Sequence, residues 1–366
     1  MRIILTSGGT GGHIYSTIAV ARALQKISEE KKIFLEMLFL GPDNFPDVKS
    51  KKILAGKLRR YFSLKNFVDF FKIIIGFWQT FWHVFWFMPD IIFGKGGYGS
   101  FPVILVGVLF RIPTIIHESD SVPGLTNRIF APFVKRITFS FPESEKYFPK
   151  AKKLLSGHPI REGILSPTKE EALSVLKLVG TKPIIFFIGG SQGAKKINDI
   201  LLEILLNLLK KYEILHQCGE NNFKEVKNEA DALFLAQKAN REYYHLFATL
   251  SEKEMGCAYA ISDLIIARAG AGTLFEIAAR GKPSIIIPLP SAAGDHQVKN
   301  AYIFAKDGKA IVLEEANFTP NFIIQEITNL LEDKEKLIRI GANAEKFAKI
   351  DAAKIIAEEI IKLAAI

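Results

Sequence analysis

Three glycine-rich segments carry the clearest chemical signal in this sequence. Ser7–His13 reads Ser-Gly-Gly-Thr-Gly-Gly-His, Gly94–Ser100 reads Gly-Lys-Gly-Gly-Tyr-Gly-Ser, and Gly189–Ala194 reads Gly-Gly-Ser-Gln-Gly-Ala. Glycines let backbone N–H groups approach an anion, and a helix N-terminus adds positive potential. The first segment lacks a Walker A ending, and Ile14 stands where the dinucleotide fingerprint has its third glycine. The segments therefore predict phosphate binding of another kind.

Isolated polar residues near these segments could add acid–base or anion-binding chemistry. The neutral imidazole of His13 could act as a base near neutral pH, although a structural role at a helix start is the more common one. Arg161 could reach an anion. Thr273 to Glu276 is typical of a capping box, which leaves a ligand role for Glu276 open. No His, Cys and carboxylate set has metal-ligand spacing, so the sequence predicts no metal site.

The elements that must position these residues follow one pattern, in which a strand leads through a glycine loop into a helix. The pattern appears at residues 2–27 and returns half a chain later at residues 184–211. Further apolar runs predict buried strands at residues 91–94, 113–117, 136–140, 264–267, 284–288 and 310–313. Alternating strands and helices predict two α/β domains with parallel sheets, whose ligands bind at the carboxyl ends of the strands. We expect the linker near residues 157–167 and a helical stretch over residues 342–366.

Composition narrows the protein class. The length of 366 residues suits two domains. A composition of 49% hydrophobic and 23% charged residues excludes a disordered or coiled-coil protein. Two cysteines, Cys218 and Cys257, cannot form a disulfide framework and are expected to be buried. The net charge of +10 implies an anionic partner.

The positive charge and the aromatic residues concentrate in one region. Residues 49–72 hold eight basic residues and one acid: Lys49, Lys51, Lys52, Lys57, Arg59, Arg60, Lys65 and Lys72, against Asp69. A stripe at helical spacing follows, formed by Trp78, Phe81, Trp82, Phe85 and Trp86. We interpret it as a membrane-surface helix with a basic flank, and a core helix is the alternative. Polar residues interrupt residues 67–88, which disfavours a spanning helix. No nucleic-acid-binding motif accompanies the patch.

Taken in chain order, the motifs resemble the MurG family, the peripheral-membrane transferases of glycosyltransferase family 28. The resemblance covers nearly the full chain and rests on the following matches: Gly8–Tyr15, Gly96–Ser100, Val122–Asn127, Ser140–Glu143, Gly157 with Pro159–Arg161, Gly189–Ala194, Arg268–Ala271 with Thr273 and Glu276, and Asp295–Gln297 with Asn300 and Ala301. It implies an α/β GT-B fold, with two Rossmann-like domains whose parallel sheets face each other across a cleft. Residues 1–160 and a returning helix at 343–366 would form the acceptor and membrane domain. Residues 161–342 would bind UDP-GlcNAc.

The resemblance also implies roles for individual residues. Residues for the acceptor diphosphate would be Gly8, Gly9, Gly96, Gly97, Tyr98 and Ser100. Residues for UDP-GlcNAc would be Thr10, Gly11, Gly12, Asn127, Arg161, Ser191, Gln192, Phe247, Ala248, Thr273, Glu276, His296 and Gln297, with Asn127 on the acceptor side. His13 would be the general base and Glu118 the second candidate. The sequence departs from the family pattern at five positions, Ser16, Ser119, Asp120, His158 and Gly272.

The function that the resemblance implies is inverting transfer of GlcNAc from UDP-GlcNAc to lipid I, which forms lipid II in peptidoglycan synthesis. It needs no cofactor, and it places the protein peripherally at the cytoplasmic face of the inner membrane, with an anionic membrane surface and cell-wall synthesis proteins as partners. Nucleic acid is not an expected partner. The alternatives are a glycosyltransferase acting on diacylglycerol, a UDP-GlcNAc epimerase of the same fold, and a non-catalytic scaffold that holds nucleotide at the membrane.

Overall fold

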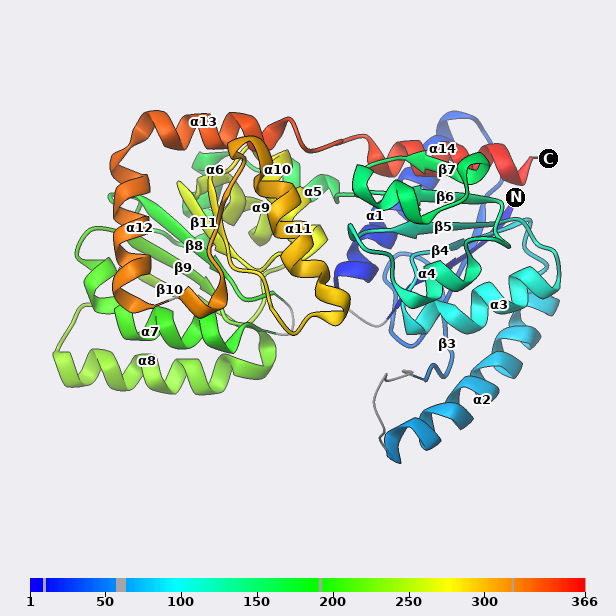
Figure 1. The fold of residues 1–366 in the computed structure, drawn as a ribbon, viewed down its shortest axis with the longest axis horizontal. Coiled ribbons are helices and arrows are strands. Elements are labelled where there is room, and N and C mark those ends of the chain that lie inside the picture. Colours follow the sequence, from blue (N-terminus) through cyan, green and yellow to red (C-terminus); the bar gives the residue numbers. More distant parts are fainter. Residues whose placement is uncertain (9–10, 57–63, 191–192, 318, 366) are drawn as a thin grey trace. The chain divides into compact units, whose positions relative to one another are not determined.

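The chain forms two compact α/β units. The structure is a computed structural model that describes residues 1–8, 11–56, 64–190, 193–317 and 319–365. Unit 1 comprises Met1–Ile160 and Lys349–Ile366, and unit 2 comprises Arg161–Ala348. Each unit contains one parallel sheet with helices packed against it (Figure 1). This confirms the predicted pair of Rossmann-like, parallel-sheet domains.

Unit 1 contains a seven-stranded sheet in the order β3-β2-β1-β4-β5-β6-β7. Its strands are β1 (Arg2–Thr6), β2 (Glu36–Gly41), β3 (Lys49–Lys52), β4 (Ile91–Gly94), β5 (Thr114–Glu118), β6 (Arg136–Phe139) and β7 (Lys153–Leu155). Its helices are α1 (Gly11–Glu30), α2 (Leu64–Phe87), α3 (Phe101–Leu109), α4 (Leu125–Phe130) and α14 (Ala352–Ala364). The central strands β1, β4 and β5 are almost wholly buried because helices cover both faces, which explains their continuous apolar runs.

Unit 2 contains a six-stranded sheet in the order β10-β9-β8-β11-β12-β13. Its strands are β8 (Ile184–Ile188), β9 (Glu213–Gln217), β10 (Tyr244–Phe247), β11 (Leu264–Ala267), β12 (Ser284–Ile286) and β13 (Ile311–Val312). Its helices are α5 (Glu162–Leu165), α6 (Lys169–Leu176), α7 (Lys195–Leu209), α8 (Phe223–Gln237), α9 (Glu252–Ile261), α10 (Ala271–Ala279), α11 (His296–Ala305), α12 (Pro320–Glu332) and α13 (Lys334–Glu345). Both cysteines are free and buried, as predicted.

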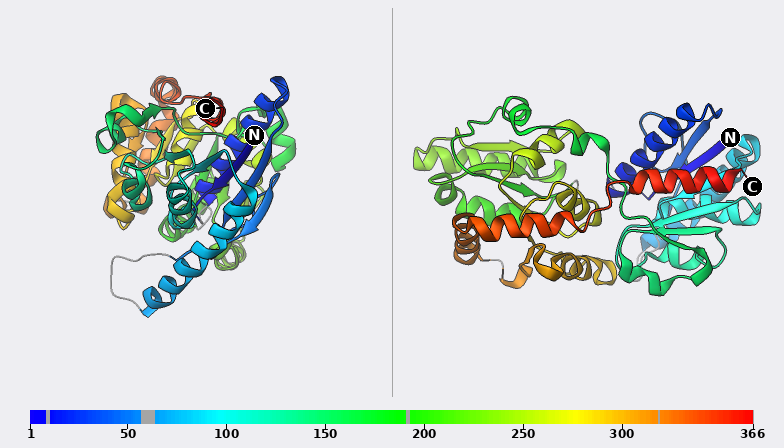
Figure 2. Two further views of the ribbon diagram at one scale, coloured as in Figure 1. Left: turned by 90° about the vertical axis from the view of Figure 1, so that its right-hand side faces the viewer. Right: turned by 90° about the horizontal axis from the view of Figure 1, so that it is seen from above.

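The C-terminal part of the chain is divided between the units. Helix α14 packs beside α1, and Ile356 and Ile360 join the core of unit 1 (Figure 2). The single helical stretch predicted from residue 342 is wrong, because α13 ends at Glu345 and α14 begins only at Ala352. The chain was also expected to return to unit 1 at residue 343, but it does so only at Lys349. Residues 343–348 remain in unit 2, where Phe347 stacks near Phe275 with a centroid distance of 4.9 Å.

Helix α2 turns several of its polar residues inward and most of its aromatic residues outward. The residues that interrupt its apolar run form the packed face: Asp69, Gly76 and Thr80 are buried, with Val84 on the same stripe. A Cβ atom at Gly76 would lie 1.8 Å from the carbonyl oxygen of Leu54, so only glycine permits this close packing. The polar interruptions therefore attach α2 to unit 1.

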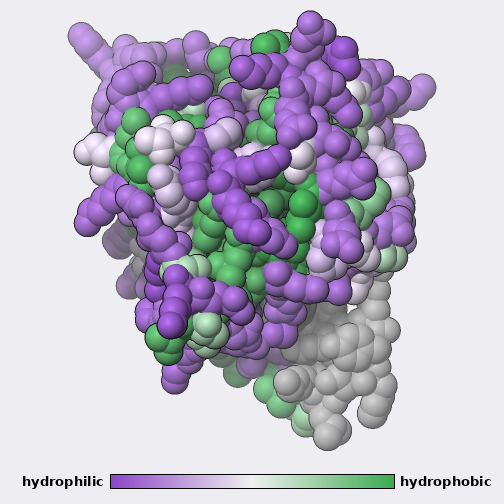
Figure 3. Space-filling model, turned by 90° about the vertical axis from the view of Figure 1, so that its left-hand side faces the viewer, coloured by the Kyte–Doolittle hydropathy of each residue, from purple (hydrophilic) through white to green (hydrophobic). Residues whose placement is uncertain are grey.

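The outer face of α2 is strongly apolar. Its exposed apolar residues are Phe67, Val68, Phe70, Phe71, Ile74, Ile75, Trp78, Trp82, Phe85 and Trp86. Phe81 does not belong to this face, since its ring lies 5.0 Å from that of Phe110 and packs against the core, which corrects the predicted stripe at one position. By contrast, hydrophilic residues predominate on the face in Figure 3, on the side where Figure 1 shows α8 and α12. No helix in the described part of the chain is long and apolar enough to cross a membrane.

Basic residues lie next to α2. Strand β3, at the edge of the sheet, exposes Lys49, Lys51 and Lys52, and the backbone N–H of Leu54 just beyond it donates to Gln79 of α2 at 2.8 Å. Lys72 pairs with Asp69. The predicted basic residues Lys57, Arg59 and Arg60 lie outside the described residues.

Candidate functional site

In unit 1, two glycine loops meet at the point where the strand order reverses. Strands β1 and β4 are neighbours, and the chain runs outward from them in opposite directions, which is where open α/β sheets bind ligands. A Cβ atom at Gly8 would lie 2.9 Å from the Cα atom of Gly97, and Gly96 and Gly97 have φ values of +81° and +78°. The first and second glycine loops are therefore in contact through backbone atoms at these glycines. Gly9 and Thr10 lie outside the described residues.

His13 lies against the second loop. It occupies the first turn of α1 with Gly11 and Gly12, and it is half-buried. Its Cε1 atom lies 3.6 Å from the position that a Cβ atom would take on Gly97. The structure therefore brings together the first loop, the second loop and the predicted general base.

Two hydroxyl groups brace the second loop. The Ser100 hydroxyl is buried and donates to the carbonyl oxygen of Gly96 at 2.7 Å, and the Thr126 hydroxyl donates to that of Gly97 at 3.0 Å. Ser100, predicted as a ligand residue, thus holds the loop from within. Tyr98 remains half-buried, and burial raises the pKa of its hydroxyl.

Glu118, at the end of β5, is buried, and its carboxylate holds the loop that follows through hydrogen bonds; we call this arrangement the Glu118 clamp. Its carboxylate accepts hydrogen bonds from the backbone N–H of Asp120 (3.0 Å), the backbone N–H of Gly124 (3.0 Å) and Nδ2 of Asn127 (2.9 Å). The Asn127 amide in turn lies 2.7 Å from the position of a Cβ atom on Gly96. Asn127 is 3% exposed and lies in unit 1, on the predicted acceptor side.

Two buried histidines lie behind this clamp. His117 contacts the hydroxyls of Thr138 (2.9 Å) and Ser140 (3.1 Å), and His158 lies 3.4 Å from the Ser140 hydroxyl. Burial holds the pKa of both histidines well below the usual range, so both are neutral at pH 7. His158, one of the departures from the family pattern, is therefore a buried polar contact.

In unit 2, the third glycine loop also lies at a reversal of strand order, between β8 and β11. Gly190 and Gly193 have positive φ values, and a Cβ atom at Gly193 would lie 1.9 Å from Nδ2 of Asn222. The loop leads directly into α7, whose N-terminus attracts anions. Ser191 and Gln192 lie outside the described residues.

A second carboxylate cluster lies in unit 2, at helices α9 and α10. Oε2 of Glu276 accepts a hydrogen bond from the Tyr259 hydroxyl at 2.9 Å, and its Oε1 lies 3.6 Å from Nη2 of Arg161. Nη1 of Arg161 lies 3.8 Å from Glu252. Burial raises the pKa of Glu276, while Arg161 and Tyr259 act in the opposite direction. Arg161 is 7% exposed, so two carboxylates surround the cation that was predicted to face a diphosphate.

The predicted capping box at Thr273 is wrong. Helix α10 begins at Ala271 with Gly270 as N-cap, so Thr273 lies inside the first turn. A capping box does occur in this unit, at Ser251 and Glu254 of α9. Glu276 is therefore not used as a cap, and its carboxylate is available to the cluster with Arg161.

The remaining predicted donor residues lie at the end of strand β10 and at the start of helix α11. Phe247 ends β10 and Ala248 follows it, and their carbonyl oxygens accept hydrogen bonds from the backbone N–H groups of Cys218 and Gly219. His296 and Gln297 begin α11, and Oε1 of Gln297 accepts a hydrogen bond from the N–H of Leu289 at 3.1 Å. These residues are half-buried, which leaves part of each side chain reachable by a ligand.

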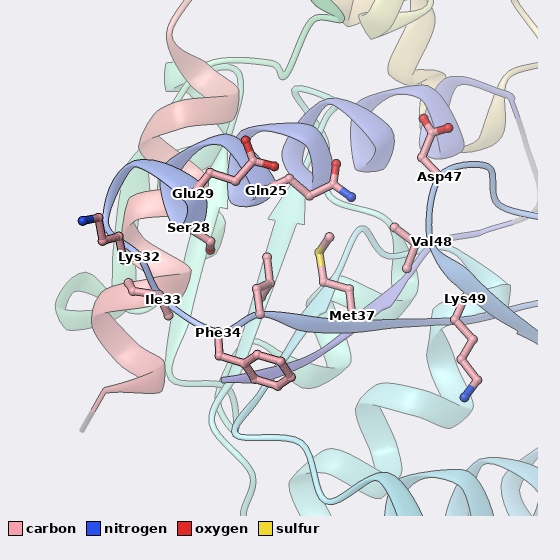
Figure 4. Close-up of a pocket in the computed structure, with 11 residues that line it drawn as sticks. Gln25, Ser28, Glu29, Lys32, Ile33, Phe34, Met37, Asp47, Val48 and Lys49 are labelled. Atoms are coloured by element: carbon pink, nitrogen blue, oxygen red, sulfur yellow. The ribbon is translucent and has the colours of Figure 1, made fainter.

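Two cavities lie elsewhere in the units. One of about 600 Å³ lies between the end of α1 and strands β2 and β3, lined by residues such as Ser28, Phe34 and Met37 (Figure 4). One of about 730 Å³ lies beside β13 and includes Tyr302 and Phe322. Neither includes a predicted site residue. Within the described ranges, no group of three or more His, Cys, Asp or Glu side chains could hold a metal ion.

Sequence reasoning missed residues that shape both sites. Tyr259 positions Glu276 but lies inside an apolar run that gives no local signal. Arg268 binds the carbonyl oxygens of Ile287 and Pro288 and pairs with Glu315, which fixes the loop before α11. Lys95 stands inside the second glycine motif, where its charge was the available signal.

The family models match most of the chain. Residues 3–139 match the glycosyltransferase family 28 N-terminal domain, and residues 184–357 match the family 28 C-terminal domain. The matched segments contain both glycine-loop sites.

Sequence relatives and solved structures agree with these matches. A UDP-N-acetylglucosamine–N-acetylmuramyl-(pentapeptide) pyrophosphoryl-undecaprenol N-acetylglucosamine transferase of Clostridium novyi (strain NT) is 37% identical over 349 residues, covering 92% of each chain. A transferase of the same name from Clostridium perfringens (strain SM101 / Type A) is 36% identical, covering 95% of this chain and 94% of the relative. The crystal structure of Acinetobacter baumannii MurG superposes with a TM-score of 0.71 at 25% identity, covering 99% of both chains.

A Neisseria meningitidis UDP-GlcNAc 2-epimerase bound to UDP-GlcNAc superposes with a TM-score of 0.68 at 15% identity, covering 99% of this chain and 100% of the epimerase, a likeness of fold alone. The resemblance to the MurG family is confirmed by relatives that share more than a third of their residues with this chain over nearly its full length. The chain belongs to glycosyltransferase family 28.

Proposed function

We propose that this protein transfers GlcNAc from UDP-GlcNAc to the C4 hydroxyl of MurNAc in undecaprenyl-pyrophosphoryl-MurNAc-pentapeptide, forming lipid II. The observation that carries the proposal is the 37% identity, over 92% of both chains, to a transferase named for this reaction. Two glycine-loop sites, one in each unit, supply a place for the lipid-linked diphosphate and a place for the nucleotide diphosphate.

Unit 1 binds the acceptor. The backbone N–H groups around Gly8, Gly96 and Gly97 hold the diphosphate of the lipid, and the N-terminus of α1 adds positive potential. His13 is the general base, because it lies against this loop and is half-buried. Glu118 is the weaker candidate, since its carboxylate is buried and already accepts three hydrogen bonds.

Unit 2 binds the donor. The third loop and the N-terminus of α7 hold the UDP diphosphate, and Glu276 accepts the ribose hydroxyls. Arg161 offsets the charge of Glu276 and adds positive potential for the leaving diphosphate. Phe247 and Ala248 line the uracil site, and His296 and Gln297 contact the GlcNAc hydroxyls.

The reaction is a single inverting displacement. His13 takes the proton of the MurNAc C4 hydroxyl as its oxygen attacks the anomeric carbon of GlcNAc. The bond from that carbon to the UDP oxygen breaks, and UDP leaves with the electron pair. Inversion converts the α linkage of the donor into a β-1,4 bond.

The protein docks peripherally on the cytoplasmic face of the plasma membrane through α2. Exposed Trp78, Trp82, Phe85 and Trp86 enter the acyl boundary, and the lysines of β3 meet anionic headgroups. We expect Phe85→Ser with Trp86→Ser to reduce co-sedimentation with anionic liposomes, and high salt to reduce it as well. Leu235→Ser, which changes an 82% exposed leucine of unit 2, is the matched control. Unchanged binding of the α2 variant would reject α2 as the anchor.

Transfer of radiolabelled GlcNAc to a lipid I analogue tests the catalytic proposal. The labelled product should carry lipid mobility and should form with stoichiometric release of UDP. Diacylglycerol, offered as a second acceptor, should remain unlabelled. Labelling of diacylglycerol without labelling of lipid I would overturn the proposed acceptor, and absence of UDP release with either acceptor would overturn the transferase activity.

A further inference from the structure

The segment that opens unit 2 lies against helix α9. We call residues 161–167 the entry segment; it begins at the first residue of the unit and contains α5. A Cβ atom at Gly256 of α9 would lie 2.4 Å from the carbonyl oxygen of Gly163 and 2.9 Å from Cγ of Pro167. The entry segment and α9 are therefore packed too closely here for any side chain at position 256.

The far end of the entry segment is attached to helix α10. Arg280 follows α10 directly, and its Nη1 and Nη2 atoms donate hydrogen bonds to the carbonyl oxygens of Leu165 at 2.7 Å and Pro167 at 2.9 Å. Both carbonyl groups lie at or beyond the end of the short helix α5, where helical partners run out. The beginning of the segment needs an attachment of its own.

Glu252 supplies that attachment through both oxygens of its carboxylate. It lies in the first turn of α9, and its Oε1 atom accepts a hydrogen bond from the backbone N–H of Gly163 at 3.0 Å. Its Oε2 atom lies 3.8 Å from Nη1 of Arg161, the N-cap residue of α5. One carboxylate therefore holds the backbone and the guanidinium group of the same segment.

Arg161 is shared between two carboxylates. Its Nη1 atom faces Glu252, and its Nη2 atom lies 3.6 Å from Oε1 of Glu276. The side chain of Arg161 is 7% exposed, and those of Glu252 and Glu276 are 21% and 14% exposed, so water and salt screen these charges only in part. Arginine keeps its charge at every accessible pH. Without the charge of Glu252, the guanidinium group would pair with Glu276 alone.

We propose that Glu252 is a positioning residue of the donor site: it binds the guanidinium group of Arg161 and the backbone N–H of Gly163, and thereby keeps Arg161 available to a nucleoside diphosphate instead of paired with Glu276 alone. The proposal rests on the proposed function, which gives Arg161 and Glu276 their roles. Glu252 acts through Arg161. A carboxylate that acted only through its own charge would repel the diphosphate, so its removal would tighten binding, and the two roles predict effects of opposite sign.

A double-mutant cycle on the full chain tests the proposal, with the Kd of UDP measured by calorimetry. Glu252→Gln should raise this Kd about tenfold, within the range of coupling between neighbouring charged residues. Arg161→Gln should also raise it. Adding Glu252→Gln to Arg161→Gln should cause no further rise, because Glu252 then has no guanidinium group to position. In transfer assays, Glu252→Gln should raise the KM for UDP-GlcNAc and leave the KM for the lipid acceptor unchanged.

A second variant moves the carboxylate without removing it. A Cβ atom at Gly163 would lie 2.6 Å from Oε1 of Glu252, so Gly163→Ala should displace this side chain and weaken UDP binding severalfold. Glu254→Ala is the matched control, because it removes the capping box of the same helix. It should lower the stability of the protein and leave the Kd of UDP unchanged.

Amide hydrogen exchange of the ligand-free protein tests the attachment without UDP. Glu252→Ala should speed exchange at Gly163, whereas Glu252→Gln, which keeps an oxygen acceptor, should exchange there as the wild type does. If the wild type binds no UDP, the proposed donor site fails, and exchange still decides whether Glu252 holds the segment. If it binds UDP but transfers no GlcNAc to lipid I, the proposed reaction fails, and the cycle still tests Glu252.

Four results would overturn the proposal. They are unchanged or tighter UDP binding by Glu252→Gln, additive losses in the double variant, a Glu254→Ala loss as large as that of Glu252→Gln, and unchanged exchange at Gly163 in Glu252→Ala. If Glu252→Gln or Arg161→Gln does not fold, Gly163→Ala decides: weaker UDP binding supports the positioning role, and wild-type affinity rejects it.

Discussion

The two units stabilise their site carboxylates by different means. In unit 2, the carboxylate of Glu276 accepts a hydrogen bond from the Tyr259 hydroxyl and lies 3.6 Å from the guanidinium group of Arg161. In unit 1, Glu118 is held by N–H donors of its own loop, and the nearby cation is a lysine without a hydrogen bond in the described structure. An arginine stays charged at every accessible pH, whereas burial lowers the pKa of Lys95 in unit 1 to about 7. The pH dependence of the reaction should therefore originate in unit 1.

The largest effect should come from removing the proposed base of unit 1. His13→Ala should lower kcat by about 10²- to 10⁴-fold, the usual contribution of general-base catalysis, with the KM for UDP-GlcNAc little changed. Steady-state transfer assays at saturating lipid I would measure this. His83→Ala, at a half-buried histidine of α2 away from the loops, is the matched control. Near-full turnover by folded His13→Ala would return the role of base to another residue.

A smaller effect separates the pH dependence of stability from that of activity. His216 of unit 2 is buried between the Tyr244 hydroxyl and Asn198, and burial lowers its pKa to about 3, against 6.5 in the unfolded chain. Between these values the unfolded chain binds the proton and the folded chain does not. Stability from this group is therefore complete above pH 6.5 and is lost as the pH falls toward 3, by about 2 kcal/mol at pH 5.

His216→Gln tests this assignment. Urea unfolding followed by circular dichroism at pH 7.5 and pH 5.0 should show a difference in unfolding free energy that is about 2 kcal/mol smaller than in the wild type. The acidic limb of the transfer rate should stay where it is, because His216 lies outside both candidate sites. A shift of that limb would contradict the assignment of pH-dependent activity to unit 1.

The smallest effect should come from the donor site. Tyr259→Phe removes one hydrogen bond to Glu276 but leaves Arg161 in place, which corresponds to about 1 kcal/mol. The KM for UDP-GlcNAc should rise about fivefold with kcat nearly unchanged. Tyr244→Phe removes a buried hydroxyl of the same unit that contacts His216, and it should leave this KM unaltered. A larger loss in kcat than in KM would indicate that Tyr259 acts on the reacting groups.

Local patterns predicted much of the fold. Strands β4 and β11 have the predicted bounds, because apolar runs bordered by glycine or polar residues are determined by neighbours in sequence. Other elements begin or end a few residues away from their predicted bounds. The prediction of a capping box at Thr273 was wrong because the first residue of a helix depends on where the preceding strand ends. Strand β11 ends early enough for α10 to begin with Gly270 as its N-cap, before Thr273.

The sequence by itself determined the glycine loops, the paired α/β pattern, the family and the concentration of charge and aromatic residues near α2. Tertiary structure alone decided which loops touch, that the polar residues of α2 face inward, and that the chain returns to unit 1 at Lys349. It also decided that Tyr259 holds Glu276. The physical reason is that strand order brings distant residues to one sheet edge, and burial there sets the charge state of each group.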